Sequence, residues 1–236
     1  MDIDFSSFVL AAATADLSDE PHARDHADAV EFRLDMASDP LDALAAYDGD
    51  LPLIATNRPT WEGGEAADGA DRLDALRTAA AHDAVAAIDV ELAAVEDGDA
   101  AGVVDDAHDR GTAVVVSTHD FAETPHRDTM REVLAEASRW GDVAKLAVTA
   151  EGAGDVLDLL GATWDAATAG ETVATMAMGE AGRHSRAVAP LYGSRIGYAP
   201  VDPADATAPG QYDLATLSAL VERLRSEGPK AGESEP

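Results

Sequence analysis

The sequence of 236 residues contains no cysteine and only two lysines, Lys145 and Lys230. Without cysteine the chain can form neither a disulfide framework nor a thiolate nucleophile or ligand. The chain has no run of about 18 apolar residues, and its N-terminus lacks the basic start of a signal peptide, so we expect a cytoplasmic protein that does not bind membranes. No glycine fingerprint for a dinucleotide follows the first predicted strand, and no GK[ST] loop for phosphate is present.

Basic residues are also scarce. The chain has 16 lysines and arginines against 46 acidic residues, which gives a net charge of −30 and a pI near 4.2. Such a surface repels nucleic acid, because phosphate binding needs clusters of lysine and arginine. The acidic residues are spread along the whole chain, which argues against a single acidic tail. Together with the depletion of lysine and the abundance of alanine and valine, this pattern is typical of a halophile's cytosolic protein.

Short β-rich runs alternate with alanine-rich helical stretches. We predict strands at 8–13, 29–35, 52–57, 86–92, 112–118, 142–148, 172–176 and 195–199, and helices near 40–47, 68–82, 98–110, 127–139, 151–160, 181–189 and 212–226. This alternation implies right-handed βαβ units around a parallel sheet. Eight units favour a single-domain (β/α)8 TIM barrel over residues 1–226, rather than an open doubly wound sheet. The last residues, 227–236, read as a disordered acidic tail.

Lys145 stands in the centre of the sixth predicted strand, among valine, alanine and leucine. An ammonium group in an apolar strand is costly to desolvate, which favours the neutral, nucleophilic amine that a Schiff-base lysine requires. Two other interpretations remain: the side chain could reach solvent from a strand end, or pair with a buried carboxylate.

His119 follows the fifth strand directly, and it is the only one of seven histidines placed so close to a strand end. In a barrel this position faces the mouth, where a neutral imidazole could transfer a proton near neutral pH. A structural histidine that is hydrogen-bonded at the strand end is the alternative. Metal binding is disfavoured because no second histidine lies at ligand spacing.

Other polar residues gather at the predicted carboxyl ends of strands. Glu31, Arg33 and Asp35 alternate along the second strand and therefore share one face, where they would pair with a ligand or form a purely structural Glu31–Arg33 pair. Arg58 follows the third strand and precedes a Gly-Gly loop, which suits clamping a carboxylate, although a plain solvent loop is equally compatible. We expect Asp89 and Glu91 of the fourth strand to be ion-pair partners in the core.

In this order the motifs resemble type I 3-dehydroquinate dehydratase, over nearly the whole chain. The matching stretches are Glu31-Phe-Arg33-Leu-Asp35, Arg58-Pro-Thr-Trp-Glu62-Gly-Gly-Glu65, Asp89-Val-Glu91-Leu92, Ser117-Thr-His119-Asp-Phe121 with Thr124-Pro125, Asp142-Val-Ala-Lys145, Met176-Ala-Met178-Gly179, Gly182 with Ser185-Arg186, Gly193-Ser194 and Ala208-Pro-Gly-Gln211.

The resemblance implies a role for each matching position. Lys145 would form an imine with the C3 ketone of 3-dehydroquinate, His119 would remove the C2 proton and protonate the departing C1 hydroxyl, and Glu62 would orient His119. The family's substrate-binding positions fall on Glu31, Arg33, Arg58, Arg186, Thr207 and Gln211. Because the protonated imine is itself an electron sink, no metal and no organic cofactor are implied. Family members are often homodimers.

Three departures from the family pattern affect substrate contacts rather than the chemistry. Thr207 stands where serine is common, the first strand reads Ala11-Ala12-Ala13 where a serine contact is sometimes made, and the eighth strand carries Tyr198 where the family usually has phenylalanine.

Two alternatives to the dehydratase were weighed. The first is a class I aldolase-type lyase, which also places an imine lysine on the sixth strand of a barrel but needs a phosphate site in the last loops. The second is a non-catalytic acidic protein that sequesters basic partners by charge, which would have no use for an amine inside a strand.

Overall fold

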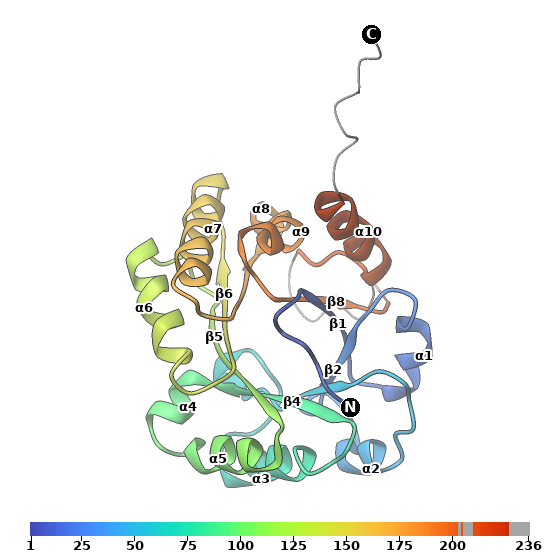
Figure 1. The fold of residues 1–236 in the computed structure, drawn as a ribbon. Helices are drawn as coiled ribbons and strands as arrows, with labels where there is room; N and C mark the ends of the chain where they lie inside the picture. The colour runs from blue at the N-terminus through green and yellow to red at the C-terminus, as the bar shows by residue number, and fades with distance from the viewer. Residues whose placement is uncertain (203, 205–209, 227–236) are drawn as a thin grey trace.

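Eight parallel strands form one sheet in the order β7-β6-β5-β4-β3-β2-β1-β8 in the computed structural model, which describes residues 1–202, 204 and 210–226 (Figure 1). The strands are β1 (Val9–Thr14), β2 (Ala29–Arg33), β3 (Leu53–Thr56), β4 (Val85–Glu91), β5 (Ala113–Asp120), β6 (Val143–Thr149), β7 (Val173–Met178) and β8 (Ile196–Pro200). Between β7 and β8 the Arg195 amide donates to the Val173 carbonyl at 2.7 Å, and the Thr175 amide donates to Ser194 Oγ at 2.9 Å. The sheet is a near-closed barrel, so the predicted (β/α)8 TIM barrel is confirmed.

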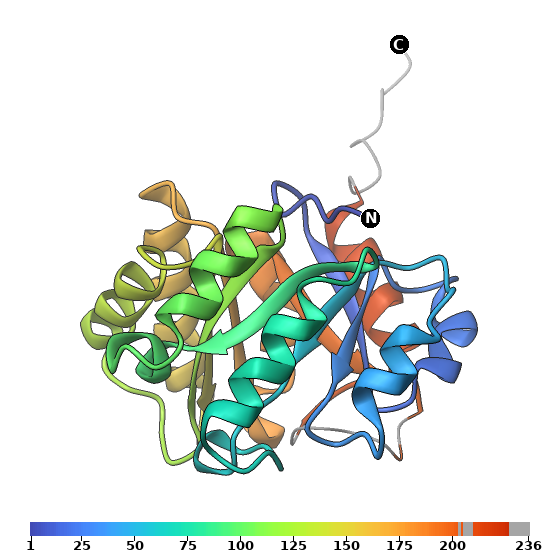
Figure 2. The same ribbon diagram turned by 90° about the horizontal axis from the view of Figure 1, so that it is seen from below.

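Helices surround the barrel (Figures 1 and 2). They are α1 (Glu20–Ala23), α2 (Pro40–Ala45), α3 (Ala70–Ala79), α4 (Leu92–Glu96), α5 (Ala101–Arg110), α6 (Arg127–Ala137), α7 (Ala153–Thr168), α8 (Gly179–Gly182), α9 (Ser185–Val188) and α10 (Leu214–Arg225), with the 3-10 turns η1 (Leu17–Asp19), η2 (Thr60–Glu62) and η3 (Ala189–Tyr192). Outward-facing strand residues such as Phe32 and Val116 pack in the large core between sheet and helices.

Inward-facing residues change from apolar to polar along β3, β4, β5 and β6, where alternate residues share a face. The lower interior holds small and medium apolar side chains, among them Ala11, Ile54, Ala87, Val115, Val143 and Ala174. One inward position further on, β3, β4, β5 and β6 present Thr56, Asp89, Ser117 and Lys145, all of them buried. The apolar layers therefore close the floor of the barrel and leave the polar residues at its carboxyl end.

Two helix predictions were wrong in extent. The helix predicted at 151–160 continues to Thr168 as α7, because its apolar residues Leu159, Leu160, Ala162 and Ala166 pack against the core. The single helix predicted at 181–189 is broken into α8, α9 and η3. Here the chain is pulled onto β7: the Ala177 amide donates to Ser185 Oγ at 2.8 Å, and a Cβ on Gly182 would lie 2.7 Å from the Ala177 carbonyl.

The tail predicted at 227–236 lies outside the described residues. Within residues 1–202, 204 and 210–226, no helix has both the length and the hydropathy that crossing a bilayer would require.

Candidate active site

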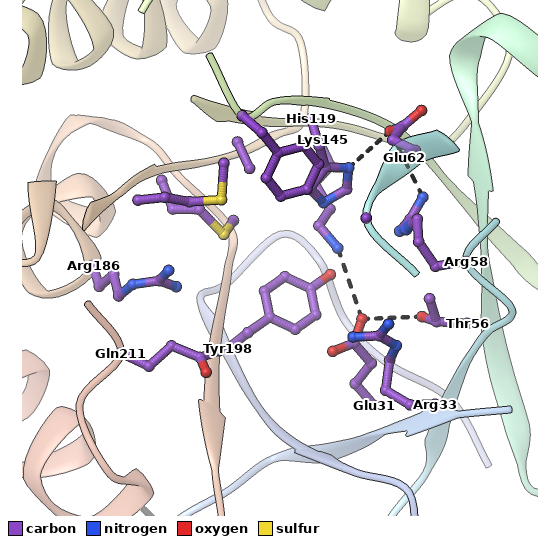
Figure 3. A pocket seen from close by; sticks show the side chains of 15 residues that line it. Glu31, Arg33, Thr56, Arg58, Glu62, His119, Lys145, Arg186, Tyr198 and Gln211 are labelled. Carbon is purple, nitrogen blue, oxygen red and sulfur yellow. Dashed lines mark hydrogen bonds and ion pairs between the residues drawn. The ribbon is translucent and has the colours of Figure 1, made fainter. Parts of the chain in front are cut away.

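One pocket at the carboxyl end of the barrel contains eight of the nine site residues that the sequence predicts (Figure 3). They are Glu31, Arg33, Arg58, Glu62, His119, Lys145, Arg186 and Gln211. The ninth, Thr207, lies outside the described residues. Thr56, Gly63, Phe121, Ala147, Met176, Met178 and Tyr198 complete the lining.

Lys145 projects from β6 into this pocket and is only 4% exposed. Its Nζ donates to Asp89 Oδ2 at 2.8 Å, lies 3.7 Å from Glu31 Oε1, and stands 4.1 Å from the centre of the Tyr198 ring. The sequence led us to expect apolar neighbours around the amine. That expectation was wrong: the strand neighbours of Lys145 are apolar, but its tip lies among carboxylates and an aromatic ring. Pairing with a buried carboxylate, one of the alternatives that the sequence left open, is confirmed by the contact with Asp89.

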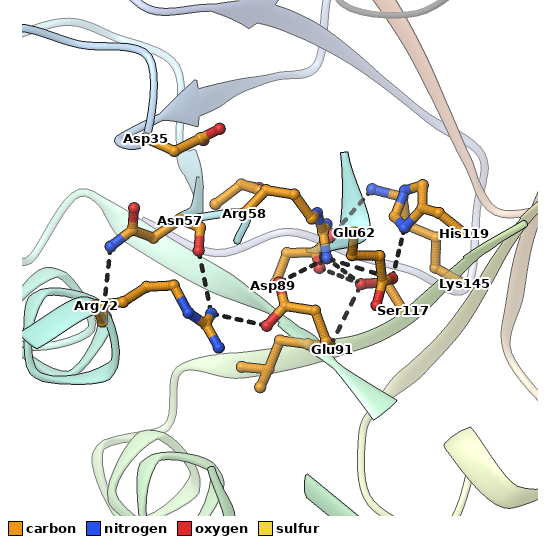
Figure 4. A network of polar contacts seen from close by, with 12 residues as sticks. Asp35, Asn57, Arg58, Glu62, Arg72, Asp89, Glu91, Ser117, His119 and Lys145 are labelled. Atoms are coloured by element: carbon orange, nitrogen blue, oxygen red, sulfur yellow. Dashed lines mark hydrogen bonds and ion pairs between the residues drawn. The ribbon is translucent and has the colours of Figure 1, made fainter. Parts of the chain in front are cut away.

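Asp89, on β4, binds two cations at once (Figure 4). Its Oδ1 accepts from Arg58 Nη2 at 2.7 Å and from Ser117 Oγ at 2.6 Å, while Oδ2 accepts from Lys145. Burial alone would raise the pKa of Asp89, but the positive charges of Arg58 and Lys145 hold it well below its ordinary value of 3.8. The carboxylate therefore stays ionised and keeps both cations in place.

Glu91 extends the network toward the outside of the barrel. Its two oxygens accept from Arg58 Nη1 at 2.8 Å and from Arg72 Nη1 at 2.7 Å, and Arg72 also donates to the Asn57 carbonyl at 3.1 Å. Both Asp89 and Glu91 are thus ion-pair partners in the core, as the sequence predicts. The guanidinium of Arg58 is consequently fixed on several sides, with Ser117 Oγ also 2.7 Å from Nη1.

His119 and Glu62 form a second buried pair. His119 Nδ1 lies 2.8 Å from Glu62 Oε1, and the side chains are 13% and 7% exposed. Burial, together with the charges of Arg58 and Lys145, lowers the pKa of His119 well below 6.5. Burial also raises the pKa of Glu62 to about 8, although Arg58 opposes this from 3.9 Å. The imidazole is accordingly neutral, with Nδ1 engaged by Glu62 and Nε2 left for the pocket.

Two glycines allow Glu62 to reach the imidazole. Gly63 ends η2 with φ at +79°, a left-handed conformation that other residues rarely adopt, and a Cβ there would lie 2.3 Å from the Phe121 ring. A Cβ on Gly64 would lie 2.0 Å from the Arg58 carbonyl. The loop therefore folds back closely on β3, and Phe121 stacks beside His119 with ring centres 6.0 Å apart.

The charged residues of β2 do not pair in the way the sequence first suggests. Arg33 pairs with Asp35, at 2.9 Å to Oδ1 and 2.6 Å to Oδ2, and Asp35 lies beyond the end of the strand. Glu31 instead accepts from Thr56 Oγ1 at 3.0 Å and faces Lys145. Asp35 therefore positions Arg33, whereas Glu31 and Arg33 line the pocket.

Arg186 and Gln211 lie across the pocket from Glu31, Arg33 and Arg58 (Figure 3). Arg186 is on α9 and is 4% exposed. Burial lowers the pKa of its guanidinium to about 10, so the side chain remains positively charged at neutral pH. A cation held out of water at this point suits an anionic group on a ligand.

Sequence reasoning missed three features of the site. Asp89 was expected in a core ion pair, but nothing in the sequence indicated that Lys145 would be its partner, since this depends on how inward side chains of β4 and β6, which lie on either side of β5, meet in the interior. Thr56 was overlooked, although it lies within the strand predicted at 52–57, one residue before its end. Tyr198 stood out in the sequence as a departure from the family pattern, and its place beneath the amine is seen only in the structure.

This fold and this site together define a barrel enzyme with a buried lysine amine beside a neutral imidazole, the arrangement of a Schiff-base lyase. A family model described as Type I 3-dehydroquinase matches residues 7–227. The chain therefore belongs to the type I 3-dehydroquinase family, which confirms the resemblance seen in the sequence and leaves the aldolase and the non-catalytic alternatives without support.

Relatives and solved structures agree with this assignment. The 3-dehydroquinate dehydratase of Haloarcula marismortui is 64% identical over 95% of this chain and 100% of its own, and that of Halobacterium salinarum is 53% identical over 94% and 100%. The crystal structure of 3-dehydroquinate dehydratase from Geobacillus kaustophilus superposes with a TM-score of 0.82 at 26% identity, covering 94% of this chain and 93% of that one. Both sequence relatives come from halophilic archaea, as the acidic composition suggested.

Replacing Asp89 by asparagine should destabilise the protein strongly. The substitution leaves Lys145 and Arg58 buried without their shared counter-charge, which costs about 3–5 kcal/mol in comparable buried pairs. Denaturant unfolding in high salt measures the change. As a matched control, Asp165→Asn removes a half-exposed partner of Arg127 and should cost less than about 1 kcal/mol. Equal losses in the two variants would contradict the importance assigned to Asp89.

Proposed function

We propose that this protein converts 3-dehydroquinate to 3-dehydroshikimate through a Schiff base on Lys145. Its family makes it a 3-dehydroquinate dehydratase, a hydro-lyase of the shikimate pathway. The observation that carries the proposed mechanism is the pairing in one pocket of a buried amine with an imidazole whose pKa is lowered. A type I enzyme from Clostridium difficile, with a TM-score of 0.80 at 26% identity over 92% of each chain, has been solved with covalent modified comenic acid.

Lys145 is the proposed nucleophile. Its Nζ condenses with the C3 ketone of the substrate and expels the ketone oxygen as water. The resulting protonated imine withdraws electrons from the adjacent C2, so a C2 proton becomes acidic enough to be removed by a weak base. This step needs no metal and no organic cofactor, because the iminium nitrogen itself accepts the electron pair.

His119 is the proposed base and acid. With Nδ1 donating to the Glu62 carboxylate, Nε2 carries the lone pair that removes the C2 proton. The enamine then expels the C1 hydroxyl, which takes a proton from His119 and leaves as water. Glu62 holds the ring in this tautomer and stabilises the transient imidazolium. Hydrolysis of the product imine restores the amine of Lys145.

The remaining pocket residues are proposed to bind the substrate. Arg186, buried and charged, is the proposed partner of the substrate carboxylate, since a guanidinium can donate two parallel hydrogen bonds to it. The substrate hydroxyls are proposed to bind four other residues of the lining: Glu31, Arg33 and Arg58, which lie across the pocket from Arg186, and Gln211, which lies beside Arg186 (Figure 3). Thr207, which is not among the described residues, is proposed to bind the substrate through its hydroxyl.

We also propose that the protein is a cytoplasmic homodimer whose barrel occupies residues 1–226. An apolar surface supports the dimer: Leu157 and Trp164, seven residues apart on one face of α7, are 68% and 54% exposed, and Leu191 and Tyr192 of the adjoining η3 are 46% and 38% exposed.

Removing the amine of Lys145 should abolish turnover. Mixing the enzyme with 3-dehydroquinate and borohydride should add the reduced substrate mass to the peptide that contains Lys145, and Lys145→Ala should lose both the adduct and the absorbance of the conjugated product. Lys230→Ala removes the only other lysine of the chain and serves as the matched control. An unchanged adduct in Lys145→Ala would refute the assignment.

The base can be tested separately from the nucleophile. His119→Ala should still form the imine, so the borohydride adduct should persist while turnover falls at least about a hundredfold. His82→Ala, at a histidine far from the pocket lining, is the control. Retention of full turnover in His119→Ala would remove the proposed proton transfer.

The pH dependence should follow the Glu62–His119 pair. Because the pKa of Glu62 is raised to about 8, the carboxylate that accepts from His119 Nδ1 forms as the pH rises through that value. In the wild-type protein we expect kcat/KM to rise with pH around pH 8. In Glu62→Gln this rise should be lost, and kcat should fall about tenfold or more. Glu132→Gln, on the outer helix α6, should leave the profile unchanged. An identical profile in Glu62→Gln would contradict the role of the pair.

If the protein is a homodimer through this apolar surface, aspartates introduced into the surface should separate the two subunits. Sedimentation equilibrium in molar potassium chloride should give twice the mass of the 24.4 kDa chain, and Leu157→Asp with Trp164→Asp should give the monomer. Leu224→Asp, exposed on α10, is the control and should stay dimeric. A monomeric wild-type protein would end the proposal.

A further inference from the structure

Tyr198 lies on β8 at the bottom of the pocket, next to the proposed nucleophile (Figure 3). Its side chain is buried, with the residue 4% exposed, and Nζ of Lys145 stands 4.1 Å from the centre of the ring. A cation over an aromatic face is attracted to it, so the ring helps to fix the amine in position. A phenylalanine at this position would make the same contact.

The hydroxyl of Tyr198 is what a phenylalanine would lack, and it has no hydrogen-bond partner among the residues that the structure describes. A buried hydroxyl without a partner costs free energy, because it has lost its hydrogen bonds to water. Ser138 Oγ also lacks a partner in the described part of the chain, but the buried hydroxyl of Thr56 donates to Glu31, and Thr163 bonds with Thr175 at 2.7 Å. Because Tyr198 lines the pocket, a molecule bound there can supply the partner that its hydroxyl lacks among the described residues.

We propose that the Tyr198 hydroxyl is a further catalytic group, which donates a hydrogen bond to the substrate oxygen that Lys145 expels. Since Nζ stands over the ring, the carbon that it attacks lies close to the phenol, and the oxygen on that carbon lies within reach of the hydroxyl at the ring's edge. No other hydroxyl of the described pocket lining is as near the amine without being bonded already, because Thr56 is committed to Glu31.

The hydrogen bond acts during imine formation. As the nitrogen–carbon bond forms, the electron pair of the C=O double bond moves onto the oxygen, and a proton that the ammonium gives up converts this oxygen into the carbinolamine hydroxyl. When the nitrogen lone pair forms the C=N bond, the hydroxyl leaves as water with a second hydrogen from nitrogen. Tyr198 stabilises the negative charge that develops on the oxygen and keeps its own proton throughout.

The surroundings suit a donor that stays protonated. Burial, with Glu31 and Asp89 nearby, raises the pKa of Tyr198 well above 10. The phenol therefore retains its hydrogen at any working pH and can donate it, whereas a hydroxyl that ionised would repel the developing alkoxide.

The inference rests on the proposed Schiff-base function and is tested with Tyr198→Phe. In a His119→Ala background, where elimination is blocked, rapid quenching with borohydride reports the rate at which the Lys145 adduct appears. We expect Tyr198→Phe to slow imine formation at saturating 3-dehydroquinate by about tenfold to a hundredfold, the usual effect of losing one hydrogen bond to a developing charge. An unchanged rate, or a rise in KM alone, would overturn the assignment.

Stability separates this role from a structural one. Tyr198→Phe should unfold at the same or a higher denaturant concentration than the parent, since its hydroxyl has no partner in the described protein. Tyr47→Phe, which loses a hydrogen bond from the hydroxyl to the Leu51 carbonyl at 2.7 Å, should unfold at a lower one. A destabilised Tyr198→Phe would show that the hydroxyl is structural and would also overturn the inference. Failure of the wild-type protein to form any adduct would instead refute the proposed function itself.

Discussion

The carboxylate of Asp89 holds the site together, because it neutralises two buried cations that come from strands on either side of β4. Lys145 approaches from β6 and Arg58 from the end of β3, and each lies within 2.8 Å of one oxygen of Asp89. Removing a charge from water is costly unless the charge is paired and hydrogen-bonded, and here the pairing is complete on both oxygens. The amine can stay inside the barrel, at a defined point beside the substrate pocket, only because this carboxylate is there.

The protein keeps two different electrostatic environments apart. Its surface carries most of a net charge of −30, while the pocket lining holds four cationic side chains, Arg33, Arg58, Lys145 and Arg186, beside Glu31 and Glu62. An anion approaching from solvent must pass the acidic surface before it reaches these cations. At the high ionic strength that such a composition suits, the Debye length shrinks to about 3 Å, so surface repulsion is screened while the buried contacts are not.

The sequence was sufficient to predict what depends on local patterns. Alternation of apolar runs with helical stretches predicts the eight strands, and the isolated Lys145 and the strand-end His119 indicate the chemistry. What depends on contacts across the barrel could not be predicted. The partner of Lys145 is set by which inward residues of β4 and β6 meet across the interior, and Arg33 pairs with Asp35 rather than Glu31 because Asp35 turns back beyond the strand end.

The helix predicted at 181–189 is broken into α8, α9 and η3 because of contacts with β7 that the sequence does not reveal. The stretch at 181–189 has helical composition, and nothing within it signals that Ser185 binds the backbone of β7 or that Gly182 must approach Ala177 closely. These contacts bend the chain into short turns, and the bend is what brings Arg186 over the pocket. In a continuous helix over residues 181–189, the helical repeat alone would fix the direction of the Arg186 side chain, without regard to the pocket.

Arg58 affects the pKa of Asp89 more than that of Glu62, because its guanidinium lies closer to Asp89. Its Nη2 lies 2.7 Å from Asp89, whose pKa is held well below the ordinary value with the help of Lys145. Its Nη1 lies 3.9 Å from Glu62, too far to offset the burial that raises the pKa of Glu62 to about 8. One carboxylate is thus a permanent anion that anchors the amine, whereas the other gains or loses its proton close to neutral pH. Two acids with nearly equal pKa values in water acquire separate tasks because a single guanidinium is closer to one of them.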